Sequence, residues 1–140
     1  MGGCQCGVIR YRFDGAPRWV MHCHCKDCRK ATASAVATYI GVKTRQAAWT
    51  AGAPARYASS PGVERLFCGH CGTPLAYIGQ RWADEVHFLH GTLDDPALWP
   101  PTGHAYIKDQ LPWFETHDEL PRYAATSGRG IEPQRCGPRN

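Results

Sequence analysis

The sequence lacks a long apolar run. Across its 140 residues no stretch approaches the roughly 18 consecutive apolar residues of a membrane-spanning helix. The opening residues, Met1 to Cys6, are too polar and too few to form a secretory signal peptide. We therefore expect a cytoplasmic protein with no membrane partner. In a reducing compartment, cysteines bind metals more often than they form disulfides.

The sequence also carries little net charge. Its formal charge of +4 counts every cysteine as neutral. If seven of the eight cysteines bound two Zn²⁺ ions as thiolates, the net charge would be about +1. There is no basic run interleaved with aromatic residues, the usual pattern of a nucleic-acid surface. We therefore expect no nucleic-acid partner.

Short segments of alternating or β-branched residues, separated by Gly, Pro and Asp, predict a mainly β fold of short antiparallel strands. The Ala-rich stretch 29–35 predicts one short helix directly after Cys28. Residues 1–123 are expected to form one domain. Residues 124–140 hold few large apolar side chains and predict a poorly ordered tail, with Cys136 as an isolated thiol. The predicted strands are 8–13, 36–42, 65–67, 75–78, 85–89 and 105–108.

The other seven cysteines fall into three clusters: Cys4 and Cys6; Cys23, Cys25 and Cys28; Cys68 and Cys71. In the last cluster two intervening residues let both sulfurs turn back on one metal, and Gly69 and Gly72 relieve the backbone there. A closed structural zinc site needs four ligands, so this pair needs a second pair. Joining it to Cys4 and Cys6 would link segments distant in sequence, where a structural metal stabilises a fold most.

The middle cluster then keeps three closely spaced thiols, Cys23, Cys25 and Cys28. Three protein ligands and an open position are typical of a catalytic zinc site. Two alternatives stay open at this point. In the first, a fourth ligand from His22, His24 or an Asp closes the cluster; in the second, the seven cysteines form disulfides. Because neighbouring residues of an extended chain point in opposite directions, the ring of His24 is expected to face away from the metal.

Several motifs in one order resemble the glutathione-dependent formaldehyde-activating enzyme family, also called GFA or CENP-V-like. They run from Gly3 to about Tyr123 and are Gly3-Cys4-Gln5-Cys6-Gly7, Cys23-His24-Cys25-Lys26-Asp27-Cys28-Arg29-Lys30, Arg65-Leu66-Phe67-Cys68-Gly69-His70-Cys71-Gly72-Thr73-Pro74-Leu75, Gly91-Thr92-Leu93-Asp94-Asp95-Pro96, His104, Trp113 and Asp118-Glu119-Leu120-Pro121. The resemblance implies an Mss4-like fold, a structural zinc on Cys4, Cys6, Cys68 and Cys71, and a second zinc on Cys23, Cys25 and Cys28. Ala33 departs from the family pattern, which often has Gly near the open site.

The resemblance also implies a zinc-dependent carbon–sulfur lyase, similar to S-(hydroxymethyl)glutathione synthase, that acts on an adduct of a small thiol such as glutathione with formaldehyde or a related aldehyde. From the residues alone, thiol exchange suits a soft three-thiolate zinc site better than hydrolysis, because three thiolates leave zinc a poor Lewis acid. The alternatives are a zinc-stabilised binding module and a thiol or metal-stress sensor that does not turn over a substrate.

Overall fold

A computed structural model describes residues 1–127, and their contacts group them into two compact units. The first unit consists of Met1–Val20 and Tyr39–Pro100. The second consists of Met21–Thr38 and the chain from Pro101 onward. The boundary therefore falls inside two strands, β3 (Trp19–Cys23) and β4 (Ala37–Lys43).

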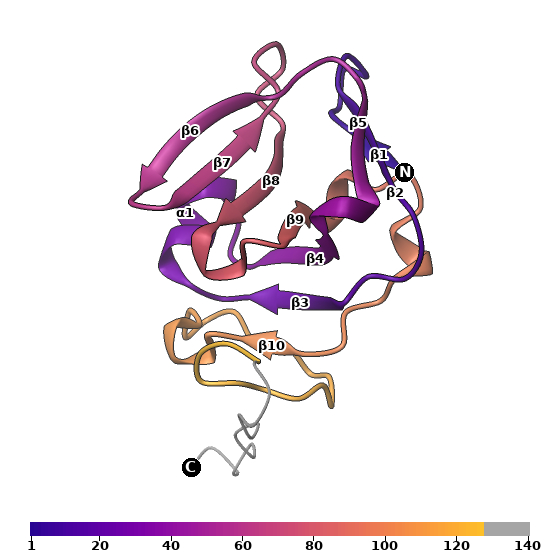
Figure 1. Cartoon of the computed structure of the whole chain (residues 1–140). Helices are drawn as coiled ribbons and strands as arrows, with labels where there is room; N and C mark the ends of the chain where they lie inside the picture. The colour runs from indigo at the N-terminus through magenta and orange to yellow at the C-terminus, as the bar shows by residue number, and fades with distance from the viewer. Residues whose placement is uncertain (128–140) are drawn as a thin grey trace, which may run out of the picture. The chain divides into compact units, whose positions relative to one another are not determined.

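Strands dominate the first unit (Figure 1). One sheet has the order β1-β2-β5, and the other part of the unit is an antiparallel ladder in the order β4-β9-β8-β7-β6. Short 3-10 helices connect several of these strands. The remaining elements are β1 (Gly2–Gly3), β2 (Arg10–Phe13), η1 (Thr44–Gln46), β5 (Ala47–Ala51), β6 (Ala55–Ser60), β7 (Val63–Phe67), β8 (Pro74–Gly79), η2 (Gln80–Trp82), β9 (Glu85–Leu89), η3 (His90–Thr92) and η4 (Pro96–Leu98).

The core of the first unit forms where the apolar faces of these strands meet. Tyr11 stacks on Phe88 with ring centroids 3.9 Å apart, and both rings are almost fully buried. Ile40 and Val42 on β4 and Leu75 on β8 are completely buried beside them. Cys4 and Cys68 belong to the same buried cluster, so one of the cysteine sites is built directly against the core.

The second unit contains α1 (Lys26–Thr32), β10 (His104–Ala105) and η5 (Ile107–Asp109). Strand β10 pairs in parallel with the end of β3, so that His104 lies opposite His22 and Ala105 opposite Cys23. Residues 121–125 continue this ladder on the other side of β10. His104 N–H donates to the Pro121 carbonyl, and Tyr123 N–H donates to the His104 carbonyl, both at 2.8 Å.

The predicted helix 29–35 is wrong in its bounds: α1 begins at Lys26 and ends at Thr32. The helix starts early because Cys25 caps it, its sulfur accepting a hydrogen bond from Cys28 N–H at 3.2 Å. The prediction for 105–108 is also wrong, since only Ala105 belongs to a strand, and Ile107 and Lys108 lie in the 3-10 helix η5. Strand β9 has the predicted bounds 85–89, and the other predicted strands overlap β2, β4, β7 and β8.

The mainly β fold class is confirmed, with one α-helix among residues 1–127. The assignment to an Mss4-like fold stays a prediction. So does the boundary between a domain at 1–123 and a tail at 124–140, because residues 128–140, including Cys136, lie outside the described residues. No helix within residues 1–127 combines the length and apolar character needed to cross a membrane.

Candidate metal centres

The first candidate centre lies entirely in the first unit. The sulfurs of Cys4, Cys6, Cys68 and Cys71 all lie within 4.8 Å of one another. The Sγ atoms of Cys4 and Cys6 are 3.4 Å apart, and those of Cys6 and Cys68 are 3.8 Å apart. Cys4 and Cys68 are buried, whereas Cys6 and Cys71 are exposed. The structure thus brings together the two pairs that the sequence placed 62 positions apart.

Two similar tight turns hold these sulfurs. In the turn after β1, Gly7 N–H donates to the Cys4 carbonyl, and Gly7 has a left-handed φ of 79°. In the turn between β7 and β8, Gly72 N–H donates to the Cys68 carbonyl, and its φ is 77°. Glycine adopts this conformation without the steric cost that a side chain would impose. Each Gly directly follows the second cysteine of its pair, so both pairs turn back on a common point.

Backbone and side-chain donors point at the sulfurs. Ile9 N–H donates to Cys4 Sγ at 3.2 Å, and Cys71 N–H lies 3.5 Å from Cys68 Sγ. The Thr73 hydroxyl accepts from Gln5 N–H at 3.2 Å and lies 3.1 Å from Cys71 Sγ, where it can donate. Hydrogen bonds of this kind stabilise thiolates. Sequence reasoning did not single out Thr73; its place two residues after the last cysteine is the signal that was available.

The pKa values of these thiols diverge because hydrogen bonds favour the thiolate at one position and the protonated thiol at another. Hydrogen bonds with Thr73 lead the effects that lower the pKa of Cys71 to about 5. For Cys6 a backbone hydrogen bond from Val8 lowers the pKa, but burial and the other three thiols outweigh it and raise the pKa to about 12. A dication among the four sulfurs would replace the protons that these thiols hold. The donor set therefore fits Zn²⁺ held by four thiolates, with every coordination position filled.

The second candidate centre lies in the second unit. The sulfurs of Cys23, Cys25 and Cys28 also lie within 4.8 Å of one another. Cys23 ends β3, Cys25 caps α1 and Cys28 lies in its first turn. Among residues 1–127, no fourth Cys, His, Asp or Glu ligand atom joins this set. A tetrahedral metal held here by protein ligands of the described chain would keep one position for a further ligand.

These three thiols are crowded as well. Hydrogen bonds with Cys25 and Cys28, followed by burial, raise the pKa of Cys23. For Cys25 the hydrogen bond with Cys23 lowers the pKa, but Cys28 and burial outweigh it, and the net change is upward. Without a cation the cluster therefore holds protons, and a soft dication would replace them. Three thiolates in this arrangement fit Zn²⁺.

The two histidines considered as a fourth ligand bind other partners. His22 Nδ1 is 2.8 Å from the Thr38 hydroxyl, and His24 Nε2 is 2.9 Å from His104 Nδ1. His24 and His104 are fully buried, and His104 Nε2 lies 3.0 Å from both oxygens of Asp118. Burial lowers the pKa of His24 to about 4, and burial also lowers the pKa of His104 despite the opposing effect of Asp118. Both rings are therefore neutral at pH 7.

Comparison with known proteins places this chain in a family. A family model described as glutathione-dependent formaldehyde-activating enzyme matches residues 1–109. A Halomonas elongata protein is 28% identical over 124 residues, which cover 81% of this chain and 78% of that protein; its name proposes it as a glutathione-dependent formaldehyde-activating enzyme. A crystal structure of a Rhodobacter sphaeroides protein, 18% identical, has a similar fold with a TM-score of 0.57, covering 66% of this chain and 86% of that one. The family match spans most of the sequence and all seven clustered cysteines, so the chain belongs to the glutathione-dependent formaldehyde-activating enzyme family.

Proposed function

We propose that the protein catalyses the reversible addition of a small thiol, glutathione, to formaldehyde or a related aldehyde, as a carbon–sulfur lyase. The observation that carries this proposal is the contrast between the two cysteine clusters. Four sulfurs form the first, whereas three form the second with no fourth ligand atom from the described residues. A site that lacks one protein ligand has a position at which a substrate thiol can bind.

In this proposal Cys4, Cys6, Cys68 and Cys71 hold one Zn²⁺ that stabilises the first unit, because they link its β1–β2 and β7–β8 turns. Cys23, Cys25 and Cys28 hold a second Zn²⁺ in the second unit. When bound there, zinc would stabilise the substrate sulfur as a thiolate. In the addition, the thiol S–H bond and the aldehyde π bond break and one carbon–sulfur bond forms. The thiol proton ends on the new hydroxyl oxygen.

The protein residues supply position and charge. Helix α1 begins at the cluster, and its cap fixes Cys25 against Cys28. Arg29 is anchored by Nη1, which donates to the carbonyls of His24 and Asp109. Its guanidinium is therefore held against the backbone between Cys23 and Cys25. No electron transfer is involved, so the reaction needs no redox cofactor from the chain.

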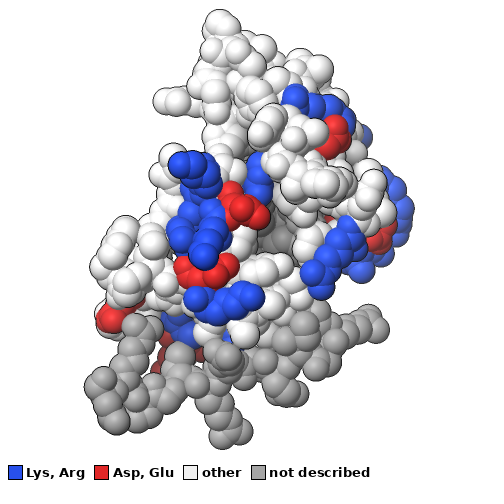
Figure 2. Space-filling view, turned by 90° about the vertical axis from the view of Figure 1, so that its left-hand side faces the viewer, with Lys and Arg blue, Asp and Glu red and all other residues white. Residues whose placement is uncertain are grey.

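Charge supports a small-molecule partner rather than an extended polyanion. On the face shown in Figure 2, Lys and Arg side chains alternate with Asp and Glu instead of forming a continuous basic surface. Ion pairs such as Arg18–Asp84 and Arg56–Glu64, at 2.8 and 2.7 Å, also bring charges of opposite sign together. Nucleic-acid surfaces concentrate one sign of charge.

The test is the exchange rate between free glutathione and its formaldehyde adduct, measured by exchange NMR on zinc-loaded protein. We expect the wild type to accelerate exchange and Cys25→Ser to abolish the acceleration. Cys136→Ser, which removes the cysteine that belongs to none of the three clusters in the sequence, is the matched control and should behave as wild type. An unaccelerated rate with wild-type protein carrying two zinc ions would contradict the proposal. Glutathione binding without acceleration would instead support a thiol-sensing role.

A further inference from the structure

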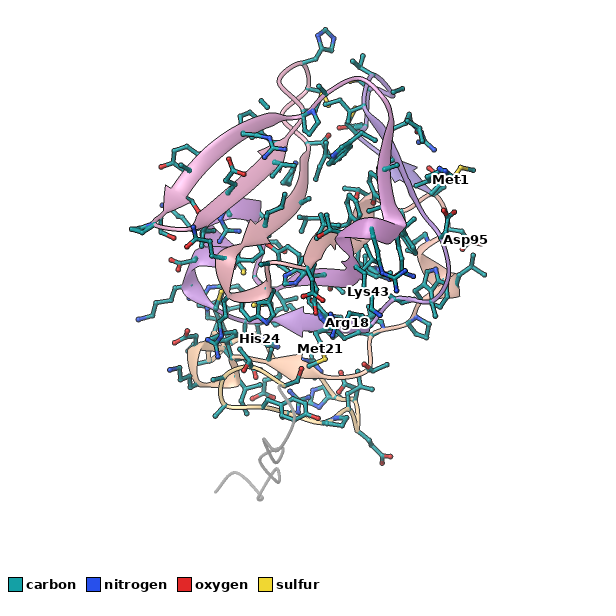
Figure 3. The ribbon with its side chains drawn as sticks, in the orientation of Figure 1. Met1, Arg18, Met21, His24, Lys43 and Asp95 are labelled. Atoms are coloured by element: carbon teal, nitrogen blue, oxygen red, sulfur yellow. The ribbon has the colours of Figure 1, made fainter. Side chains whose placement is uncertain are left out.

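A chain of polar side chains runs away from the second cysteine cluster. His24, between Cys23 and Cys25, contacts His104, and His104 contacts Asp118. The distances are 2.9 Å between His24 Nε2 and His104 Nδ1 and 3.0 Å from His104 Nε2 to the carboxylate. All three residues belong to the second unit. Figure 3 labels His24, which directly follows β3 in the chain.

The same segments are joined by their backbones. His22 N–H donates to the Gly103 carbonyl and His24 N–H to the Ala105 carbonyl, each at 3.0 Å. The parallel ladder therefore continues past the end of β3 to the residue between two of the cysteines. Because His22 and His24 are two positions apart, both rings meet His104, with centroids 4.9 and 5.2 Å away. Cys23 points to the other side of the strand.

The carboxylate determines which nitrogen of each ring carries its hydrogen. A carboxylate only accepts, so His104 Nε2 must donate to Asp118. His24 Nδ1 is buried with no hydrogen-bond partner among the described residues, so a hydrogen on that atom would be left unpaired. The hydrogen of this ring therefore lies on Nε2, which donates to His104 Nδ1. Any other tautomer would place two hydrogens, or none, in one of the two contacts.

Asp118 is itself held in place. Arg122, a buried cation, has Nη2 3.4 Å from Asp118 Oδ1, 3.0 Å from the Thr116 carbonyl and 2.7 Å from its hydroxyl. Leu120 N–H donates to the same Asp118 oxygen at 3.1 Å. The carboxylate is only about one-third exposed. Such a fixed acceptor imposes its orientation on the ring it contacts rather than following it.

We propose that Asp118 is a positioning residue for the second metal centre: through His104 it fixes the tautomer and orientation of His24 and thereby the backbone that presents Cys23 and Cys25. The inference rests on the proposed zinc on this cluster. In this proposal neither Asp118 nor His104 contacts a reacting atom. They act as partners that keep ligands preorganised, a role that metal sites commonly give to residues outside the ligand set.

The direct test of the hydrogen-bond chain is ¹⁵N NMR of the imidazoles in the wild-type zinc-loaded protein. We expect both His24 and His104 to carry hydrogen on Nε2 and none on Nδ1. The opposite pattern in either ring would overturn the inference. This measurement needs no variant, so it does not depend on how a substituted protein folds.

The consequence for the metal is tested with Asp118→Asn, whose amide can present a donor to His104 Nε2 and so reverse both tautomers. Glu119→Gln is the matched control: it removes a neighbouring, exposed carboxylate. Titration with a competing chelator, followed by native mass spectrometry, measures the affinity of each bound zinc. We expect Asp118→Asn to lower about 10-fold the affinity for the zinc proposed on Cys23, Cys25 and Cys28, which is the ion that Cys25→Ser removes. The affinity for the other zinc should be unchanged. Glu119→Gln should match the wild type.

Equal zinc affinity in the two variants would overturn the positioning role, even if the tautomers are as expected. Loss of both zinc ions in Asp118→Asn would also contradict it, because the effect would then be general unfolding rather than support of one site. Failure of the proposed function is distinguishable. A wild-type protein that binds a single zinc would rule out the second centre and with it the proposed function. The inference alone fails if a protein that binds two zinc ions has equal zinc affinities in Asp118→Asn and Glu119→Gln.

Discussion

Two non-glycine residues of the described chain have left-handed backbone conformations, Ala33 and Tyr106. Ala33 follows α1 with φ of 51° and ψ of 34°, and its N–H closes the helix on the Arg29 carbonyl. Glycine is the usual residue there, because a Cβ in this conformation costs about 1 kcal/mol. Ala33 thus ends the helix that carries Cys28 at an energetic cost. The departure from the family pattern therefore affects the backbone at the end of α1.

Ala33→Gly is expected to stabilise the protein by about 1 kcal/mol, because it relieves this conformation. The control is Ala31→Gly, on an exposed position inside the same short helix, which should destabilise by about 1 kcal/mol. Urea unfolding measures both. If the two substitutions changed stability in the same direction, the left-handed strain at Ala33 would not be the reason.

At the scale of elements, β9 carries a buried acid that joins neighbouring segments of the first unit. Glu85 accepts from His87 Nε2 at 2.9 Å and from Trp19 Nε1 at 3.0 Å, and lies 3.0 Å from Arg18 Nη1 (Arg18 is labelled in Figure 3). Trp19 cannot easily move away, because its indole packs directly on Gly41 of β4, where any Cβ would overlap it. Burial raises the pKa of Glu85, but these hydrogen bonds and Arg18 outweigh burial and lower it.

A carboxyl with a lowered pKa in the folded state stabilises the fold at pH values above its unfolded pKa of about 4.3, and this contribution is lost as the pH falls through the folded pKa. Glu85→Gln should therefore cost about 2 kcal/mol at pH 7, the range of hydrogen bonds to a charged group. The difference from wild type should begin to shrink as the pH falls below about 4.3, and it should disappear below the lowered folded-state pKa of Glu85. Glu64→Gln, in an exposed pair with Arg56, is the control and should cost under about 0.5 kcal/mol. A cost for Glu85→Gln that does not change with pH would contradict this account.

Elements with a strong local pattern could be predicted from the sequence, and elements without one could not. Strand β9 alternates clearly and has its predicted bounds. Strands β5 and β6 are rich in Ala and Ser, lack clear alternation and were not predicted; pairing with β2 and β7 makes them strands. The start of α1 was missed because its cap is a cysteine sulfur, which helix propensities do not include.

In the candidate sites, too, local spacing could be predicted from the sequence, and long-range contacts without a local pattern could not. The spacing of Cys23, Cys25 and Cys28 is local, so their proximity followed from the sequence. The grouping of the outer cysteine pairs needed an argument about linking distant segments, and their sulfurs do lie together. Metal binding by either set stays a prediction. The contact of His24 with His104 spans 80 positions and had no local pattern, so only the fold could bring it to light.

For the whole molecule, the central claim is that two cysteine clusters have different tasks, one closed and structural, one open and reactive. The clusters lie in different compact units and share no ligand. Zinc at the closed set should contribute strongly to folding of the first unit, because its four ligands come from turns that are distant in sequence. Loss of zinc at the open set should leave that unit folded.

The most direct test is the zinc content of protein purified without chelator, measured by native mass spectrometry together with circular dichroism. The account predicts two zinc ions per chain in the wild type, and one in a folded Cys25→Ser variant. Cys68→Ser should instead lose the structural ion and unfold the first unit. A single zinc in the wild type, or two zinc ions retained in Cys25→Ser, would contradict the division into a closed and an open centre.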